Sequence, residues 1–167
     1  MKRLWLLRHA KSSWDDPALP DRDRPLAPRG HRAADRMAEQ LRANAPDVDL
    51  VLCSSALRTR ETLERMTGAF GDAEVVVEDA LYGASDDELL ERLRVVDDAS
   101  DTVALIGHNP GIADLATTLA GSGKELERLR AKFPTGALAV LEFDGPWRGL
   151  ATGRADLVSF VTPKDLA

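Results

Sequence analysis

Short aliphatic runs alternate along this chain with longer segments whose apolar residues recur at helical spacing. Runs of four to seven residues that are rich in Val, Leu and Ile are typical of buried strands. We expect strands at residues 3–7, 49–53, 74–77, 102–106, 137–143 and 157–161.

Between these runs the apolar positions favour helices. The clearest spacing ends just before Pro46, which acts as a stop signal. Ser85 and Glu88 form a capping-box pattern, which predicts that a helix begins there. We expect helices at residues 29–43 and 56–66, from residue 85 onward, and from Pro110 to about Ala120.

This alternation predicts an α/β fold, a three-layer sandwich with a mostly parallel central sheet flanked by helices. All 167 residues fit a single domain. Residues 11–28 are polar and contain prolines, so they predict a long loop of the kind that often serves function. In parallel sheets, ligands collect at the carboxyl ends of the strands.

Candidate catalytic residues follow three of the expected strands. Arg8 and His9 come after the first, Arg58 lies a few residues after the second, and His108 follows the fourth. Arginine matches phosphate oxygens with forked donors, a neutral imidazole can attack phosphorus, and a second imidazole can stabilise the charge. The combination predicts a phosphoryl-transfer site that needs neither metal nor cofactor.

Residues next to these four could add to such a site. A helix that begins at Pro110 would aim free backbone N–H groups at an anion beside His108 and Asn109. We therefore count Asn109 and Ser12 as candidate substrate-binding residues. Lys11 and Arg24 could line the same pocket or only keep the long loop hydrated.

Charge and composition limit the partners. The formal net charge is -6 and the pI is near 5.1, which argues against general binding to nucleic acid or to anionic membranes. Any anion must therefore bind at a local basic site. A single cysteine, no long apolar span and no cleavable leader predict a cytoplasmic protein.

Four segments resemble one known family. LLRHAKSSW at 6–14, SSALRTRET at 54–62, IGHNPG at 106–111 and DRDRPLAPRG at 21–30 are similar to the histidine phosphatase superfamily, also called phosphoglycerate mutase-like. The short SixA-type phosphohistidine phosphatases share them most fully. The resemblance implies the phosphoglycerate mutase-like fold, His9 as the nucleophile, and Arg8, Arg58 and His108 as its partners on phosphate.

The chain departs from the family pattern at two positions. Ala10 stands where the first motif usually has glycine, and Asp15 stands where many members have asparagine. The resemblance also implies a carboxylic acid that protonates the leaving group, and its nearest match is Asp79, with Glu78 beside it. A weak acid favours phosphohistidine as substrate, because imidazole leaves phosphorus with less help than an alkoxide does. The expected partner is a phosphorylated substrate, such as a protein that carries phosphohistidine.

The residues by themselves leave other functions open. Cys53 before a helix suggests a cysteine phosphatase, but four residues separate it from Arg58 where that loop has five. A nucleotide switch would need GxxxxGK[ST], which is missing. A phosphatase or mutase acting on small phosphoesters, or a module that binds phosphate without turnover, are the further alternatives.

Two more groups have a simpler structural interpretation. His31 lies early in an expected helix and is interpreted as structural. The acidic cluster of Asp86, Asp87, Glu88 and Glu91 looks like a metal site, but acidic residues in a first turn stabilise the helix dipole.

Overall fold

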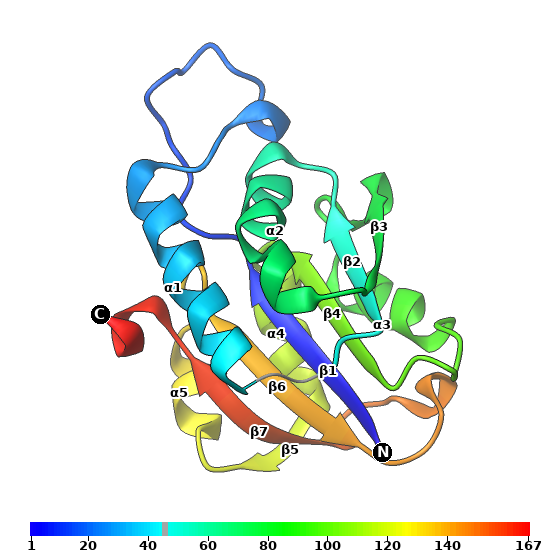
Figure 1. Ribbon diagram of the computed structural model, residues 1–167. Coiled ribbons are helices and arrows are strands. Elements are labelled where there is room, and N and C mark those ends of the chain that lie inside the picture. The colour runs from blue at the N-terminus through cyan, green and yellow to red at the C-terminus, as the bar shows by residue number, and fades with distance from the viewer. Residues whose placement is uncertain (45–46) are drawn as a thin grey trace.

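The computed structural model describes residues 1–44 and 47–167, and within them a single seven-stranded sheet forms the centre of the molecule (Figure 1). The strand order is β3-β2-β4-β1-β6-β7-β5. The strands are β1 (Lys2–Arg8), β2 (Leu50–Ser54), β3 (Glu74–Glu78), β4 (Thr102–Gly107), β5 (Ala120–Gly123), β6 (Leu138–Phe143) and β7 (Ala155–Val161).

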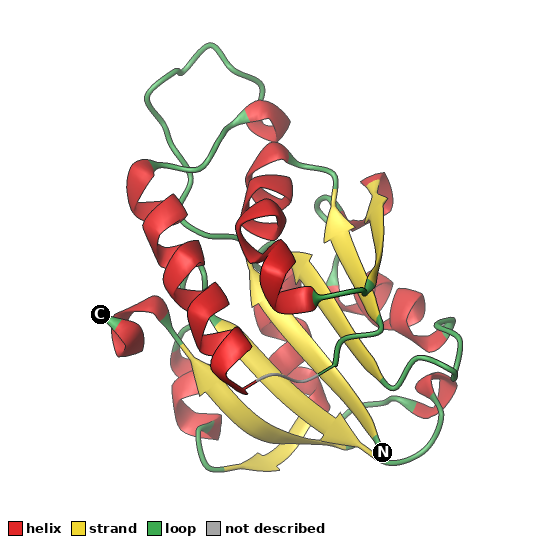
Figure 2. Cartoon of the chain, in the orientation of Figure 1, coloured by secondary structure: helices red, strands yellow, loops and turns green. Residues whose placement is uncertain are grey.

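Helices cover both faces of this sheet (Figure 2). Helices α1 and α2 pack on one face, and α3, α4 and α5 lie on the other. The helices are α1 (Pro28–Asn44), α2 (Leu57–Phe70), α3 (Asp86–Arg94), α4 (Gly111–Leu119) and α5 (Leu126–Ala131).

Strand β1 is central and joins two different halves of the sheet. It runs parallel to β4, which is followed outward by β2 and β3, also parallel. On its other side it pairs antiparallel with β6, and β6 pairs antiparallel with β7. The predicted α/β fold with a mostly parallel sheet between helical layers is therefore confirmed.

The alternation of side chains along β1 explains how one strand supports both layers. Leu4 and Leu6 are buried in the core beneath α3, α4 and α5, whereas Trp5 and Leu7 face α1 and α2. Because successive strand residues point to opposite faces, a strand buried on both sides must be apolar throughout. This is why the sequence shows a continuous run there rather than an alternating one.

The structure adds a strand, β5, and an α-helix, α5, that the sequence did not predict. The segment that forms β5 contains Gly121 and Gly123 and no β-branched residue, so only its pairing with β7 makes it a strand. Helix α5 has six residues, too few to show a helical period. Helix α4 ends at Leu119, close to the expected end at about Ala120, where β5 begins, and the expected stop at Pro46 lies outside the described residues.

The capping box at the start of α3 is confirmed. The Ser85 hydroxyl accepts from the N–H of Glu88, and the Glu88 carboxylate accepts from the N–H of Ser85. Asp86 and Asp87 lie in the same first turn. Across residues 1–44 and 47–167, no group of three or more His, Cys, Asp or Glu side chains is placed to hold a metal ion. No described helix is long and apolar enough to cross a membrane.

Parallel pairing brings the predicted motifs to one edge of the sheet. Arg8 at the end of β1 lies opposite Gly107 at the end of β4, and Cys53 near the end of β2 lies opposite Ile106. The long loop after β1 rises beyond this edge (Figure 1). The three motifs are therefore neighbours although they are far apart in the chain.

Candidate active site

His9 sits directly after β1 in a buried position. Its backbone N–H donates to the carbonyl of Gly107 at 3.1 Å, and its ring Nδ1 lies 2.7 Å from the carbonyl oxygen of Ala10. A carbonyl can only accept, so Nδ1 carries the proton and Nε2 keeps its lone pair. Burial lowers the pKa of His9 to about 3, so the ring is neutral at ordinary pH.

His108 follows β4 and faces the first histidine. The two ring centroids are 5.2 Å apart, and Nε2 of His108 lies 2.7 Å from the hydroxyl oxygen of Ser54. Burial, with a smaller effect from the nearby charge of Arg58, lowers the pKa of His108 to about 4. Its Nδ1 is buried and has no hydrogen-bond partner among the described residues. That atom is therefore available to a ligand.

Arg58 lies in the first turn of α2 and its side chain is buried. Its guanidinium donates to the Asp21 carbonyl at 2.8 Å and to the Asp21 carboxylate at 3.0 Å. The hydroxyl of Tyr82 donates to the same carboxylate, and this bond, followed by those from Arg24 and Arg58, lowers the pKa of Asp21 to about 2. The long loop thus supplies a counter-charge to Arg58.

Arg8 reaches the site from the end of β1. One of its terminal nitrogens donates to the Phe133 carbonyl at 3.1 Å, while its Nε is buried without a partner among the described residues. Burial and the charge of Arg58 lower the pKa of Arg8. Asn109 donates its amide to the same Phe133 carbonyl at 2.9 Å and accepts from the N–H of Ala113. The predicted ligand Asn109 therefore ties the start of α4 to the segment before β6.

Thr62 connects the segment after His9 to the start of α2. The backbone N–H of Ala10 donates to the hydroxyl of Thr62, which in turn donates to the carbonyl of Arg58. Ala10 and Thr62 are both completely buried. This chain of bonds fixes the segment after His9 against the helix that carries Arg58.

The predicted ligand Ser12 is engaged elsewhere. Its hydroxyl accepts from Arg24, which also stacks on the ring of Trp14 and donates to the carbonyl of Ser13. Arg24 therefore joins two parts of the long loop to each other, residue 24 and residues 12–14. Asp15 is exposed, and its backbone N–H donates to the Ser13 hydroxyl.

Asp79 lies at the rim of the site, directly after β3. Its carboxylate is exposed and accepts from Arg22 at 2.8 Å. A hydrogen bond from Ser55, together with Arg22, lowers the pKa of Asp79. The neighbouring Glu78 pairs with Arg92 of α3 and so takes no part. Asp79 is therefore ionised near neutral pH and is a poor proton donor.

Two candidates fall outside this group. Cys53 is buried within β2, and burial raises the pKa of its thiol to about 12, which speaks against a cysteine nucleophile. His31 is half-buried on α1, and within the described residues no hydrogen bond or ring contact joins it to His9 or His108.

Some residues around the site were not singled out from the sequence. Asp21 lies within a segment that resembles the family, and Tyr82 lies three residues after Asp79, but nothing in their spacing says that they meet Arg58. Ser54 was noted only as part of its motif, and the Phe133 carbonyl carries no side-chain signal at all.

Comparison with known proteins agrees with this geometry. The sequence profile of the histidine phosphatase superfamily (branch 1) matches residues 4–85. An uncharacterized protein of Mycobacterium tuberculosis is 44% identical over 162 residues, which cover 95% of this chain and all of that protein.

Two solved structures match over almost the whole chain. The first, from Nakamurella multipartitia, was assigned as the phosphohistidine phosphatase SixA and is 37% identical, with a TM-score of 0.83 over 97% of this chain and 96% of that one. The second, from Agrobacterium tumefaciens and assigned in the same way, is 30% identical, with a TM-score of 0.82 over 97% and 98% of the two chains.

Proposed function

Because this chain belongs to the histidine phosphatase superfamily, in its SixA-type branch, we propose that it hydrolyses phosphohistidine on a protein through a phosphoenzyme formed on His9. The family and the fold support a phosphatase, and the choice of substrate is the part that we infer. The observation that carries the proposal is the bond from His9 Nδ1 to the Ala10 carbonyl, which leaves Nε2 as a buried, neutral nucleophile.

In the first step, Nε2 of His9 attacks phosphorus, and the bond from phosphorus to the leaving nitrogen breaks. Negative charge on the equatorial oxygens is stabilised by Arg8, Arg58 and His108. The unpaired Nε of Arg8 and Nδ1 of His108 supply donors that no group in residues 1–44 and 47–167 uses. Arg58 exchanges its contacts with Asp21 for contacts with phosphate.

We propose that the contact with Ser54 sets the tautomer of His108. The Ser54 hydroxyl oxygen accepts from the N–H of Ala56 at 3.3 Å, and we assign the hydroxyl proton to Nε2 of His108, 2.7 Å away. A neutral His108 that accepts at Nε2 carries its proton on Nδ1. Because Nδ1 has no other partner among the described residues, its N–H can donate a hydrogen bond to a phosphate oxygen.

In the second step, water attacks the phosphorus on His9, the P–N bond to His9 breaks, and phosphate leaves. The ring of His9 returns to its neutral form with Nδ1 still bonded to Ala10. No metal ion takes part in either step that we propose.

Asp79, once it has taken up a proton from water, is the carboxyl group that we propose as proton donor to the leaving nitrogen. Its bonds to Ser55 and Arg22 hold its pKa below the ordinary value, so it is a poor acid near neutral pH. A leaving imidazole needs less protonation than an alkoxide, whose conjugate acid is far weaker. The site therefore favours a P–N bond over a sugar phosphate.

The test is to trap the phosphoenzyme. Wild type and His9→Ala are incubated with a labelled phosphohistidine protein or with a labelled sugar phosphate, quenched in alkali, and separated from the donor by size. We expect label on the wild type only, and faster from the phosphohistidine protein. Faster labelling from the sugar phosphate would instead indicate a phosphoester phosphatase, and no label from either donor would indicate a module that binds phosphate without turnover.

A further inference from the structure

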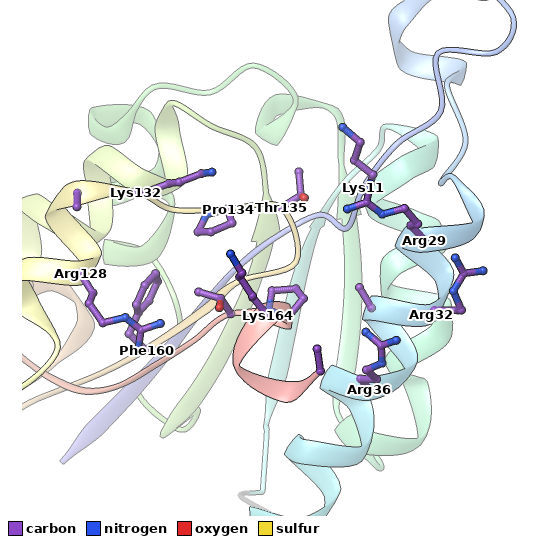
Figure 3. A pocket seen from close by; sticks show the side chains of 15 residues that line it. Lys11, Arg29, Arg32, Arg36, Arg128, Lys132, Pro134, Thr135, Phe160 and Lys164 are labelled. Carbon is purple, nitrogen blue, oxygen red and sulfur yellow. The ribbon is translucent and has the colours of Figure 1, made fainter.

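A basic groove of about 910 Å³ lies between the start of α1, the end of α5 and the last residues of the described chain (Figure 3). The close-up shows side chains of α1 along one wall, Arg128 and Lys132 on the other, and Lys164 between them. Six of the cations that line it are Lys11, Arg29, Arg32, Arg36, Lys132 and Lys164.

The charge of this groove is unbalanced. No Asp or Glu is among the residues that line it. Within residues 1–44 and 47–167, none of the six cations forms an ion pair, and all six side chains belong to exposed residues. Arg128 also lines the groove, but it is neutralised by Glu125 and Asp165. A cluster of this kind on a chain of net charge -6 is a local site for an anion.

The groove adjoins the segment that carries His9. Lys11 on its rim is two residues beyond His9 in the chain. Thr135 on its wall is followed by Gly136, whose N–H donates to the backbone carbonyls of Arg8 and His9 at 3.1 and 2.9 Å. A molecule whose phosphoryl group reaches His9 therefore has the groove beside it.

We propose that this groove docks an acidic segment of the protein whose phosphohistidine enters the site, an inference that rests on the proposed function. Its volume of about 910 Å³ and its walls on three segments suit a chain segment of a protein, whereas a bilayer is flat. The remaining surface is more acidic than the net charge suggests, because the groove holds so many of the cations. That surface repels a membrane or a nucleic acid and leaves the groove to a compact acidic partner.

The test compares two double variants with equal change of formal charge. R32E/R36E reverses two cations of α1 in the groove, and R148E/R154E reverses two exposed cations at the opposite end of the sheet. We measure kcat/KM for a phosphohistidine protein with an acidic surface and for free phosphohistidine, which is too small to fill the groove. We expect R32E/R36E to lose about tenfold or more with the protein and little with free phosphohistidine, and R148E/R154E to keep both rates.

Equal losses of R32E/R36E on both substrates, or no loss on the protein, would overturn the docking role. If the wild type turns over neither substrate, the proposed function fails, and the groove is tested alone with a fluorescein-labelled polyglutamate peptide. Peptide binding that R32E/R36E abolishes and R148E/R154E keeps supports the groove. The absence of peptide binding, or tighter binding to phosphatidylserine vesicles or duplex DNA, overturns it.

Discussion

At the scale of single residues, the site depends on two histidines that burial keeps uncharged. An imidazolium has no lone pair and cannot attack phosphorus. The environment of His9 therefore determines the lowest pH at which its ring is still neutral and can act as a nucleophile. The Ala10 carbonyl favours protonation of His9, but desolvation outweighs it and the pKa stays near 3.

We therefore predict that His9 does not titrate between pH 5 and 8. The ring C–H signals of His9, assigned by comparison with His9→Gln, should stay constant over that range in an NMR titration, since half-protonation is expected at a pH of about 3. A midpoint near the ordinary value of 6.5 would show that His9 is solvated and would contradict the buried geometry.

The same shift links protonation to stability. The unfolded chain binds a proton on His9 below its ordinary pKa of 6.5, while the folded chain binds it only near 3, so the free energy of unfolding decreases as pH falls through this window. Urea unfolding of wild type and His9→Gln at pH 7 and pH 5 should show a smaller decrease in the variant. An equal decrease in both would assign the pH dependence to other groups.

Arg58 is expected to act through its forked donors and not through charge alone. Arg58→Lys keeps the charge but loses the paired contacts that now reach Asp21, so kcat should fall on the order of 100-fold. Arg65→Lys on the exposed side of the same helix is the control and should leave kcat unchanged. Near-wild-type turnover in Arg58→Lys would place phosphate binding elsewhere.

At this scale the sequence selected four residues that the structure brings to one edge of the sheet, and their chemical roles stay predictions. Arg8, His9, Arg58 and His108 were selected from strand ends, and parallel pairing explains why they meet. Contacts made by a backbone carbonyl leave no such signal, so the role of Phe133 in holding Arg8 could not be seen.

At the scale of elements, close approach between backbone segments determines how the loops are fixed. Gly30 in the first turn of α1 lies against the segment after His9, and a Cβ built there would stand 2.1 Å from the carbonyl oxygen of Lys11. The contact requires glycine, since the atom that would be hit belongs to the backbone and cannot rotate away.

We predict that Gly30→Ala destabilises the protein by about 1–3 kcal/mol, because α1 or the Lys11 segment must shift. It should also lower kcat, since a shift of Lys11 moves the adjoining active-site residues. Thermal unfolding and turnover are compared with Gly149→Ala, where the nearest atoms to a Cβ lie 3.9 Å away. Equal Tm values for the two variants would mean that the contact between Gly30 and the Lys11 backbone leaves room for a methyl group, which would contradict the structure.

The elements that the sequence missed share one cause. β5 and α5 are short, and their local residues carry a weak signal, so they exist through pairing with β7 and packing against α4. Strands β1, β2 and β4 of the parallel half carry their own signal, because each is buried on both faces. Prediction therefore succeeded where the element is autonomous and failed where it depends on neighbours.

At the scale of the whole molecule, the proposed active site and the large buried side chain of Trp147 lie at opposite ends of the sheet. The carboxyl ends of the parallel strands carry the site, and the other end is closed by Trp147. This indole is fully buried, packs against Phe143 with centroids 5.1 Å apart, and donates to the carbonyl of Ser100 at 2.7 Å.

Trp147→Ala is therefore expected to cost about 3–5 kcal/mol of stability while the folded fraction keeps its kcat. Denaturant unfolding measures the loss, and turnover is measured at a temperature where the variant is folded. Val158→Ala, on a half-exposed side chain of β7, serves as the control and should change stability by less than about 0.5 kcal/mol. A fall in kcat with Trp147→Ala would show that the two ends are coupled.

The central place of β1 also has a consequence during synthesis on the ribosome. Leu7 in β1 pairs with Ile106 in β4 and with Leu138 in β6, so its partners are translated much later. At typical translation rates the delay to β6 is on the order of ten seconds. Until β6 is translated, a strand as apolar as Leu4 to Leu7 can pair on its β4 side only, so its other edge stays open and makes the nascent chain prone to association with other chains. The seven-stranded sheet is complete only after β7 has been translated.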